Sequence, residues 1–143
     1  MYEINNEELL LGDVPYKDIL HYFPEWREHH LKSEVDASLI DRLKKIDELL
    51  NIVCYLGSWC SDSKQGVPPF MKALHKANND NIRIQLIAVN RQKDEPQHRS
   101  IQHNIQRVPT FLIYKNGEEI GRLIEFPMQD NFIQDFLSVL ASK

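Results

Sequence analysis

Apolar and polar residues follow a strand–helix–strand pattern in the middle of the chain. Apolar runs at residues 51–57 and 82–89 are bounded by turn-forming residues and predict two buried strands. The stretch between them, from about residue 61 to residue 77, opens with polar residues that favour helix starts and predicts a helix. Because a helix that joins two strands of one sheet in this way makes a right-handed crossover, we expect the strands to be parallel.

The pattern downstream predicts a smaller set of elements. A short polar helix is expected at residues 95–104. Apolar runs at 110–114 and 119–124 predict a hairpin, because the Asn116-Gly117 pair between them favours a tight turn. Residues 129–141 carry apolar side chains on one helical face and predict a closing helix.

The first fifty residues have a mainly helical pattern. A short helix is expected at residues 7–11. A second is expected from a cap-like opening at Asp13 to Phe23, where Pro24 interrupts it, and residues 25–31 are compatible with helix or loop.

A stronger helical signal follows at residues 37–50. Asp36 is a good N-cap residue, and apolar side chains then recur at helical spacing. We expect this helix to pack on the sheet and support the core, in preference to a role in binding a partner.

Length, composition and charge exclude several classes of protein. The chain has 143 residues, of which 42% are hydrophobic, and this fits one domain. The net charge of −4 gives no basic surface for nucleic acid, and no apolar run is long enough to cross a bilayer. The acidic start lacks a secretory pattern, and two cysteines cannot form a disulfide framework, so we expect a reducing, cytoplasmic location.

Cys60 is the candidate reactive residue, because it lies where the first strand gives way to the helix. Helix N-termini favour anions, so a thiol there ionises more readily, and the thiolate is the nucleophile. Asp62 has two opposing effects: a carboxylate suits the helix start, but its charge opposes ionisation of Cys60. Cys54, in the strand, is expected to be a small buried hydrophobic residue; the alternative is a second thiol that Cys60 reaches after local movement.

The segment Trp59-Cys60-Ser61-Asp62-Ser63 resembles the Trp-Cys-x-x-Cys active site of the thioredoxin family, with serine replacing the second cysteine. Pro68 lies where that family's active-site helix is kinked. Val108-Pro109-Thr110 resembles the family's cis-proline loop, and Lys115-Asn116-Gly117 resembles its last hairpin turn.

The resemblance spans roughly residues 50–142 and implies one α/β domain of thioredoxin-like fold over residues 1–143. Such a domain has a central mixed β-sheet flanked by helices on both faces. Residues 51–142 would form the core, and residues 1–50 an N-terminal helical extension.

The resemblance also implies a chemistry, with Cys60 and Ser63 as the catalytic residues. In a dithiol site the second cysteine resolves the mixed disulfide that the first one forms. Ser63 cannot do this, although its hydroxyl can donate a hydrogen bond to the Cys60 thiolate. Thiol–disulfide exchange would therefore be monothiol, with an external thiol such as glutathione completing the cycle. Replacing the second cysteine of such a site by serine is also a common way to trap mixed disulfides. An engineered Ser63 is therefore an alternative to a natural one.

Four further residues are implied to bind substrate. Trp59 would shield the thiol and offer a flat contact, and a cis Pro109 would lie against Cys60 with Val108 and Thr110 flanking a peptide groove. The expected partners are protein disulfides or low-molecular-weight thiols and disulfides, and no oligomeric state is predicted. The alternative is a non-catalytic binding module that uses the groove near Trp59 and Pro109 to hold a partner without redox turnover.

No cofactor or metal is expected. The six histidines form no recognised ligand pattern with cysteine or carboxylate. The chain also lacks a phosphate-binding glycine loop and a Gly-x-Ser-x-Gly elbow, so the sequence supports neither nucleotide binding nor serine hydrolase chemistry.

Overall fold

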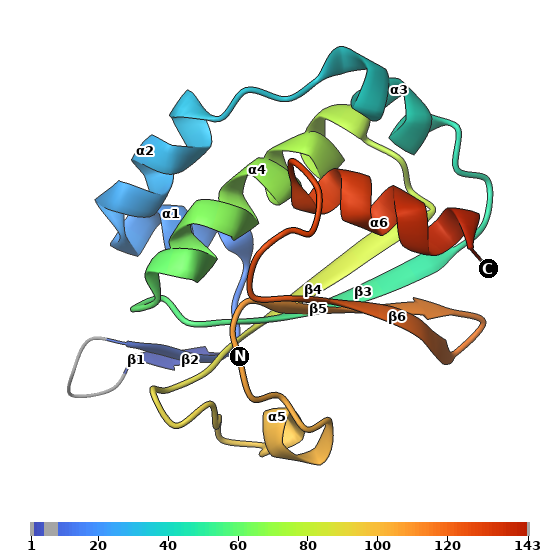
Figure 1. Ribbon diagram of the computed structural model, residues 1–143. Coiled ribbons are helices and arrows are strands. Elements are labelled where there is room, and N and C mark those ends of the chain that lie inside the picture. The colour runs from blue at the N-terminus through green and yellow to red at the C-terminus, as the bar shows by residue number, and fades with distance from the viewer. Residues whose placement is uncertain (1, 5–8, 143) are drawn as a thin grey trace.

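A six-stranded mixed sheet forms the centre of the structure (Figure 1). The structure is a computed structural model that describes residues 2–4 and 9–142. Neighbouring strands follow the order β1-β2-β4-β3-β5-β6, and β3 and β4 are parallel while the other neighbouring pairs are antiparallel. The strands are β1 (Tyr2–Ile4), β2 (Leu10–Asp13), β3 (Leu50–Leu56), β4 (Ile82–Ala88), β5 (Thr110–Lys115) and β6 (Glu118–Ile124). The predicted mixed sheet is confirmed.

Helices flank both faces of the sheet, but unequally. Helices α1–α4 and α6 cover one face, and the short α5 lies against the other (Figure 1). The bounds are α1 (Tyr16–Tyr22), α2 (Pro24–Lys32), α3 (Ala37–Lys44), α4 (Ser61–Ala77), α5 (Arg99–Gln102) and α6 (Phe132–Ala141). The parallel strands β3 and β4 are joined by α4, as the sequence pattern predicts. No helix among the described residues is both long and apolar enough to cross a membrane.

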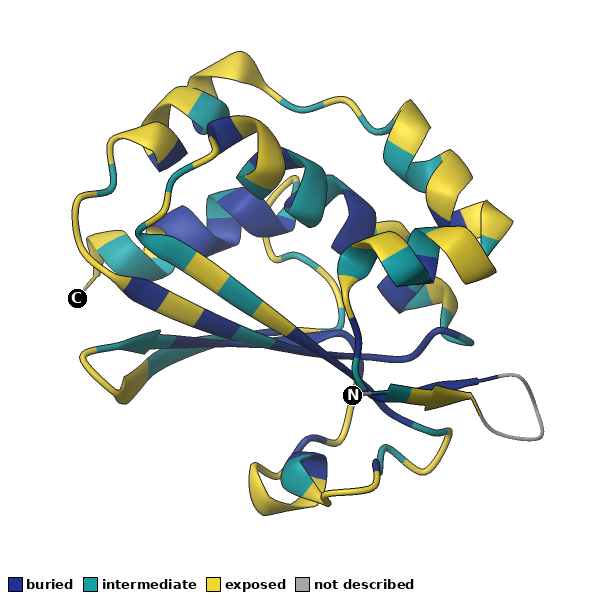
Figure 2. Cartoon of the chain, turned by 180° about the vertical axis from the view of Figure 1, so that it is seen from behind, coloured by how far each residue is buried: buried dark blue, intermediate teal, exposed yellow. Residues whose placement is uncertain are grey.

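The central strand β3 contributes to the cores on both sides of the sheet. Ile52 and Cys54 belong to the larger core beneath the helices, whereas Tyr55 belongs to a smaller one on the α5 side. Successive side chains of a strand point to opposite faces, and buried and exposed bands alternate along the strands in Figure 2. Burial on both sides explains why the segment is an almost continuous apolar run.

Four phenylalanines hold α4 and α6 against β5. The ring centroids of Phe70 and Phe111 are 4.6 Å apart, those of Phe111 and Phe132 are 4.9 Å apart, and Phe136 packs edge-on against Phe70 at 5.9 Å. Each such pair contributes about 0.5–1.5 kcal/mol beyond its buried area. This cluster fixes the direction of α4, whose first residues carry the candidate site.

The predicted helix at residues 7–11 is wrong where the structure describes it. Leu10 begins β2, which pairs with β4 through Gly12 and Ala88; residues 7 and 8 lie outside the described residues. In β2, buried residues alternate with half-buried ones, which is the period of a strand. The N-terminal extension is therefore a β-hairpin followed by helices, not a purely helical segment.

The helix predicted at residues 37–50 ends at Lys44, and Leu50 opens β3. The predicted cap is confirmed, since the Asp36 carboxylate accepts a hydrogen bond from the backbone N–H of Ser38 at 2.8 Å. At the other end, the side-chain amide of Asn79 donates to the carbonyls of Leu43 and Ile46. The first bond satisfies a carbonyl in the last turn of α3, and the second holds the segment that follows it before the chain enters the sheet.

Other predicted boundaries move by several residues. The helix expected from Asp13 begins at Tyr16, and Pro24 opens α2, so that residues 25–31 are helical. Proline suits the first helical position, where an N–H would lack an intrahelical partner. The helix expected at 95–104 shrinks to α5, because side-chain bonds at Glu95 and Ser100 shape the preceding turns.

Candidate active site

Cys60 lies at the N-cap of α4, directly after the turn that ends β3. The turn is closed by a hydrogen bond from the Cys60 backbone N–H to the Gly57 carbonyl at 3.0 Å, and the helix starts with the bond from Lys64 N–H to the Cys60 carbonyl. A side chain at Gly57 would have its Cβ 2.6 Å from the Trp59 ring, so glycine permits this close packing. Cys60 is half-buried, so a disulfide can reach its sulfur.

The Cys60 sulfur faces the loop before β5. Its thiol donates a hydrogen bond to the carbonyl oxygen of Val108, with 3.5 Å between the two atoms. The sulfur makes no capping hydrogen bond with the first turn of α4. The two segments that carry the predicted site residues therefore meet at this contact.

The Val108–Pro109 peptide bond is cis. The Pro109 carbonyl accepts from the backbone N–H of Glu125 at 2.7 Å, and the Thr110 hydroxyl donates to the Arg107 carbonyl at 2.6 Å. The side chains of Val108, Pro109 and Thr110 are buried. Contacts from these three residues to a substrate would come from the backbone, and their side chains anchor the loop.

Ser63 lies beneath the turn and is fully buried. Its hydroxyl oxygen accepts a hydrogen bond from the backbone N–H of Gly57 at 3.1 Å. Among the described residues, the hydrogen bond of the Cys60 thiol goes to the Val108 carbonyl and not to Ser63. In this thiol form of the protein, Ser63 holds the turn that carries Cys60, and its hydroxyl proton remains able to donate.

Trp59 is anchored to the end of β4 and lies among cations. Its indole N–H donates to the Val89 carbonyl at 2.9 Å. The Arg91 guanidinium carbon and the Lys93 ammonium are 5.2 and 5.6 Å from the centre of the ring, within range of cation–π attraction. No sequence motif marks Arg91 or Lys93, because both lie in an irregular segment.

A pocket of about 380 Å³ opens beside Cys60, and one wall of it comes from the N-terminal extension. Trp26 of α2 is buried, and its indole N–H donates to the Ser58 carbonyl at 3.2 Å. The Lys64 ammonium lies 2.6 Å from the Glu25 carboxylate and lowers the pKa of Glu25. This wall was not predicted, because it depends on α2 packing against α4 and no local sequence pattern indicates that packing.

Cys54 is fully buried in β3, next to Phe111 of β5 and Leu86 of β4 in the strand register. Burial raises the pKa of its thiol well above the ordinary value. Both cysteines are free. The prediction that Cys54 is a buried hydrophobic residue is confirmed.

Metal ligands do not cluster in the part of the chain that the structure describes. Residues 2–4 and 9–142 contain no group of three or more histidine, cysteine or acidic side chains placed to hold a metal ion. His30 accepts or donates in a 3.0 Å contact with the Tyr16 hydroxyl, and His98 pairs with Asp94.

Comparisons with known proteins show which family the chain belongs to. The model of a family described as thioredoxin matches residues 21–138. A thioredoxin from Echinococcus granulosus is 30% identical over 92 residues, which cover 64% of this chain and 78% of that protein. A thioredoxin from Mycoplasma genitalium is 28% identical over 102 residues, which cover 68% of this chain and 94% of that protein. The chain belongs to the thioredoxin family.

A solved structure extends the likeness in fold. A protein of unknown function from Pseudomonas aeruginosa, PA1234, is similar with a TM-score of 0.71 and 14% identity, over 92% of this chain and 93% of that one. At this identity the likeness concerns the fold alone. The predicted α/β thioredoxin-like fold is confirmed, and the match extends into the additional elements before residue 51.

Proposed function

We propose that this chain performs thiol–disulfide exchange as a monothiol through Cys60. The observation that carries the proposal is the position of its sulfur at the start of α4, half-buried and 3.5 Å from the Val108 carbonyl. The thiolate is the nucleophile in such an exchange, and the accessible part of this sulfur is where it would meet a substrate disulfide. Trp59 packs beside it and offers a flat surface for the substrate.

The reaction has two exchange steps. Cys60 loses its proton to solvent, and the thiolate attacks one sulfur of a substrate disulfide; a Cys60–substrate disulfide forms, the original bond breaks, and the departing sulfur takes up a proton. An external thiol such as glutathione then attacks the mixed disulfide. Cys60 returns as a thiol, and the substrate sulfur is left in a disulfide with the external thiol. A second thiol molecule attacks that disulfide, which frees the substrate thiol and leaves the two external thiols joined as a disulfide.

The chain's other groups make a dithiol cycle unfavourable. The residue three positions after Cys60 is Ser63, whose buried oxygen is held by the Gly57 N–H. Cys54, the second cysteine of the sequence, is enclosed in β3, and burial raises the pKa of its thiol. Resolution from outside the chain is therefore the proposed route, with protein disulfides and small thiols as the partners and a reducing cytoplasm as the setting.

The test is incubation with glutathione disulfide, followed by mass spectrometry of the intact chain and of its peptides. We expect one glutathione per chain, bound at Cys60, in the wild type and in Cys54→Ala, and none in Cys60→Ser. An internal disulfide between Cys54 and Cys60 would replace the monothiol proposal with a two-cysteine one. A folded wild type that forms no adduct would favour the non-catalytic binding module.

A further inference from the structure

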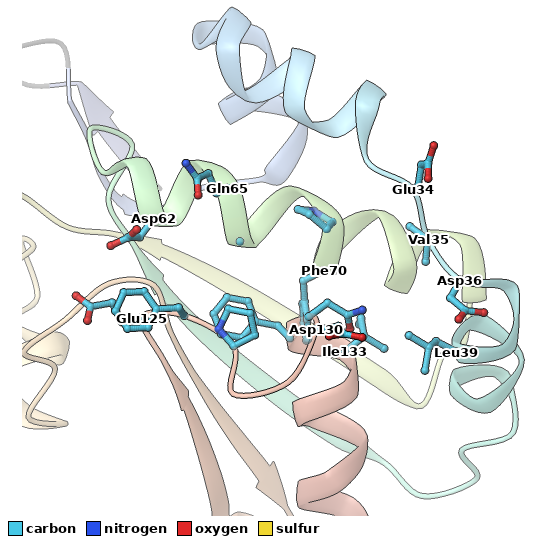
Figure 3. A pocket seen from close by; sticks show the side chains of 16 residues that line it. Glu34, Val35, Asp36, Leu39, Asp62, Gln65, Phe70, Glu125, Asp130 and Ile133 are labelled. Carbon is cyan, nitrogen blue, oxygen red and sulfur yellow. The ribbon is translucent and has the colours of Figure 1, made fainter.

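A second cavity, of about 260 Å³, lies on the opposite side of α4 from α2 and is called the acidic cleft here (Figure 3). It is enclosed by the first half of α4, by the segment that leads into α3 together with the start of α3, and by residues 125–133, which link β6 to α6 and begin α6. Its inner surface is apolar and includes Phe70 and Ile133, and Figure 3 shows both at the centre of the cavity.

The charged groups that line the acidic cleft are all carboxylates. They are Glu34, Asp36, Asp62, Glu125 and Asp130, and the lining includes no lysine, arginine or histidine. Hydrogen bonds from Ser38 lower the pKa of Asp36. Glu125 pairs with Arg107 at 2.8 Å, but Arg107 is 63% exposed, and such a pair is readily exchanged for another cation. The cleft therefore complements a positive ligand.

An exposed aromatic ring adds an apolar contact to these charges. Phe126 lines the cleft and is 59% exposed, so its ring is open to a ligand. Aliphatic stems of lysine and arginine pack well on such surfaces while their charged ends reach carboxylates. A ligand that combines basic and apolar groups would satisfy both features of the cleft.

One end of the acidic cleft lies close to the candidate active site. Asp62, which lines this end, is two residues after Cys60. Glu125, which also lines it, donates a backbone hydrogen bond to the carbonyl of Pro109 in the cis-proline loop. Figure 3 shows Asp62 and Glu125 at one end of the cavity and Glu34 and Asp36 at the other. From Asp62 to Phe70 the helix rises about 12 Å, a length that three to four residues of extended chain span.

We propose that the acidic cleft binds a short extended segment of the substrate protein in which basic residues flank an apolar one. This inference rests on the proposed function, because it names the class of protein disulfide that Cys60 attacks. The disulfide of the substrate lies at Cys60, and the basic segment follows α4 away from it. Glutathione, which is anionic, then acts as the resolving thiol and does not use this cleft.

Binding is tested without thiol chemistry in the Cys60→Ser protein. Fluorescence anisotropy compares labelled peptides that contain Arg-Leu-Arg, Glu-Leu-Glu or Arg-Gly-Arg within one common frame. We expect the first to bind most tightly, and the double variant Glu34→Gln/Asp130→Asn to weaken it about tenfold, the effect of losing two exposed ion pairs. The charge-matched control is Asp47→Asn/Glu118→Gln, whose residues are exposed and do not line the cleft.

The apolar part of the cleft has its own matched pair of variants. Phe126→Ala should weaken the Arg-Leu-Arg peptide several-fold, whereas Met128→Ala should not, because Met128 is 92% exposed in the same segment but does not line the cleft. Equal binding of the basic and acidic peptides, or equal effects of the cleft and control variants, would overturn the proposal. Because adduct formation with glutathione disulfide is measured separately, that result would leave the monothiol chemistry intact.

The link to Cys60 is tested in the wild type with cysteine-containing forms of the same peptides as mixed disulfides. The basic–apolar disulfide should react faster than the acidic one, and the difference should shrink in Glu34→Gln/Asp130→Asn. If the cleft binds the basic peptide but both disulfides react at equal rates, the cleft does not select substrates for Cys60 and the proposal fails. If no disulfide reacts at all, the proposed function fails instead.

Discussion

The sulfur of Cys60 and the carbonyl oxygen of Val108 are 3.5 Å apart, although the two residues are 48 positions apart in the chain. This contact joins the start of α4 to the loop before β5. Val108 and Pro109, the residues on the two sides of this carbonyl, are both buried. The Val108 backbone therefore lies directly beside the sulfur that a substrate disulfide would react with.

The two cysteines should differ strongly in reactivity. Cys60 is half-buried at a helix start, whereas Cys54 is fully buried and its pKa is raised by burial. Brief labelling with substoichiometric iodoacetamide, followed by peptide mass mapping, should find the label at Cys60. Preferential labelling of Cys54 in folded protein would contradict the assignment, and labelling in denaturant provides the control in which both cysteines react.

Ser63→Ala should destabilise the fold, because it leaves the buried backbone N–H of Gly57 without its acceptor. Loss of a buried partner costs about 1–3 kcal/mol. Ser61→Ala, two residues away and exposed, is the matched control and should change the free energy of unfolding by about 0.5 kcal/mol or less. Urea unfolding of the three proteins measures both. Equal stabilities of Ser63→Ala and the wild type would show that the bond to Gly57 contributes little.

The fold should lose stability in alkali through Tyr55. Burial raises the pKa of Tyr55 to about 12 from an ordinary value near 10. A phenol with a raised pKa stabilises the folded state fully below the unfolded pKa, and this contribution is lost as the pH rises from about 10 to about 12, by up to about 2–3 kcal/mol. Tyr55→Phe removes the titrating group. Its free energy of unfolding should fall less steeply over this pH range than that of the wild type.

Local patterns were sufficient to predict the position of Cys60, because a buried strand, a glycine turn and a polar helix start are adjacent in the chain. The contacts that shape the surroundings are not adjacent. Trp26 reaches Ser58 across 32 positions, and the acidic cleft depends on how the segment before α3 packs beside α4. Such contacts result from the packing of whole helices, and no pattern of residues at fixed sequence spacing predicts them.

The error in the first residues has a different cause. Short apolar runs such as Leu9-Leu10-Leu11 fit a helical turn and a strand equally well, because too few positions are present to show a period. Pairing with β4 decides the outcome: Gly12 lies opposite Ala88, and Leu10 is fully buried in the core. In the same way, Leu50 fits the spacing of the preceding helix, but its N–H donates a hydrogen bond to the Asn81 carbonyl, where the paired strands β3 and β4 begin.

Ser63→Cys should give the protein a resolving thiol. Residues three apart on a helical turn are neighbours, so sulfurs at positions 60 and 63 can bond with little backbone movement. Mild oxidation should therefore convert the variant, and not the wild type, to a form with no free thiol at Cys60. The measurement is thiol counting and peptide mapping before and after oxidation.

The gain in turnover should be partial, for two reasons that the structure supplies. Cysteine is a poorer acceptor than serine for the Gly57 N–H, so the turn that carries Cys60 loosens. The carboxylate of Asp62 lies between the two positions in the chain, and its negative charge repels the anionic thiolates that carry out the exchange. Disulfide-reduction activity should rise above that of the wild type, and Cys60→Ser in the same background should abolish it. If Ser63→Cys forms no disulfide with Cys60 while the fold remains intact, the two side chains do not approach each other in solution, and the prediction of a resolving thiol at position 63 is wrong.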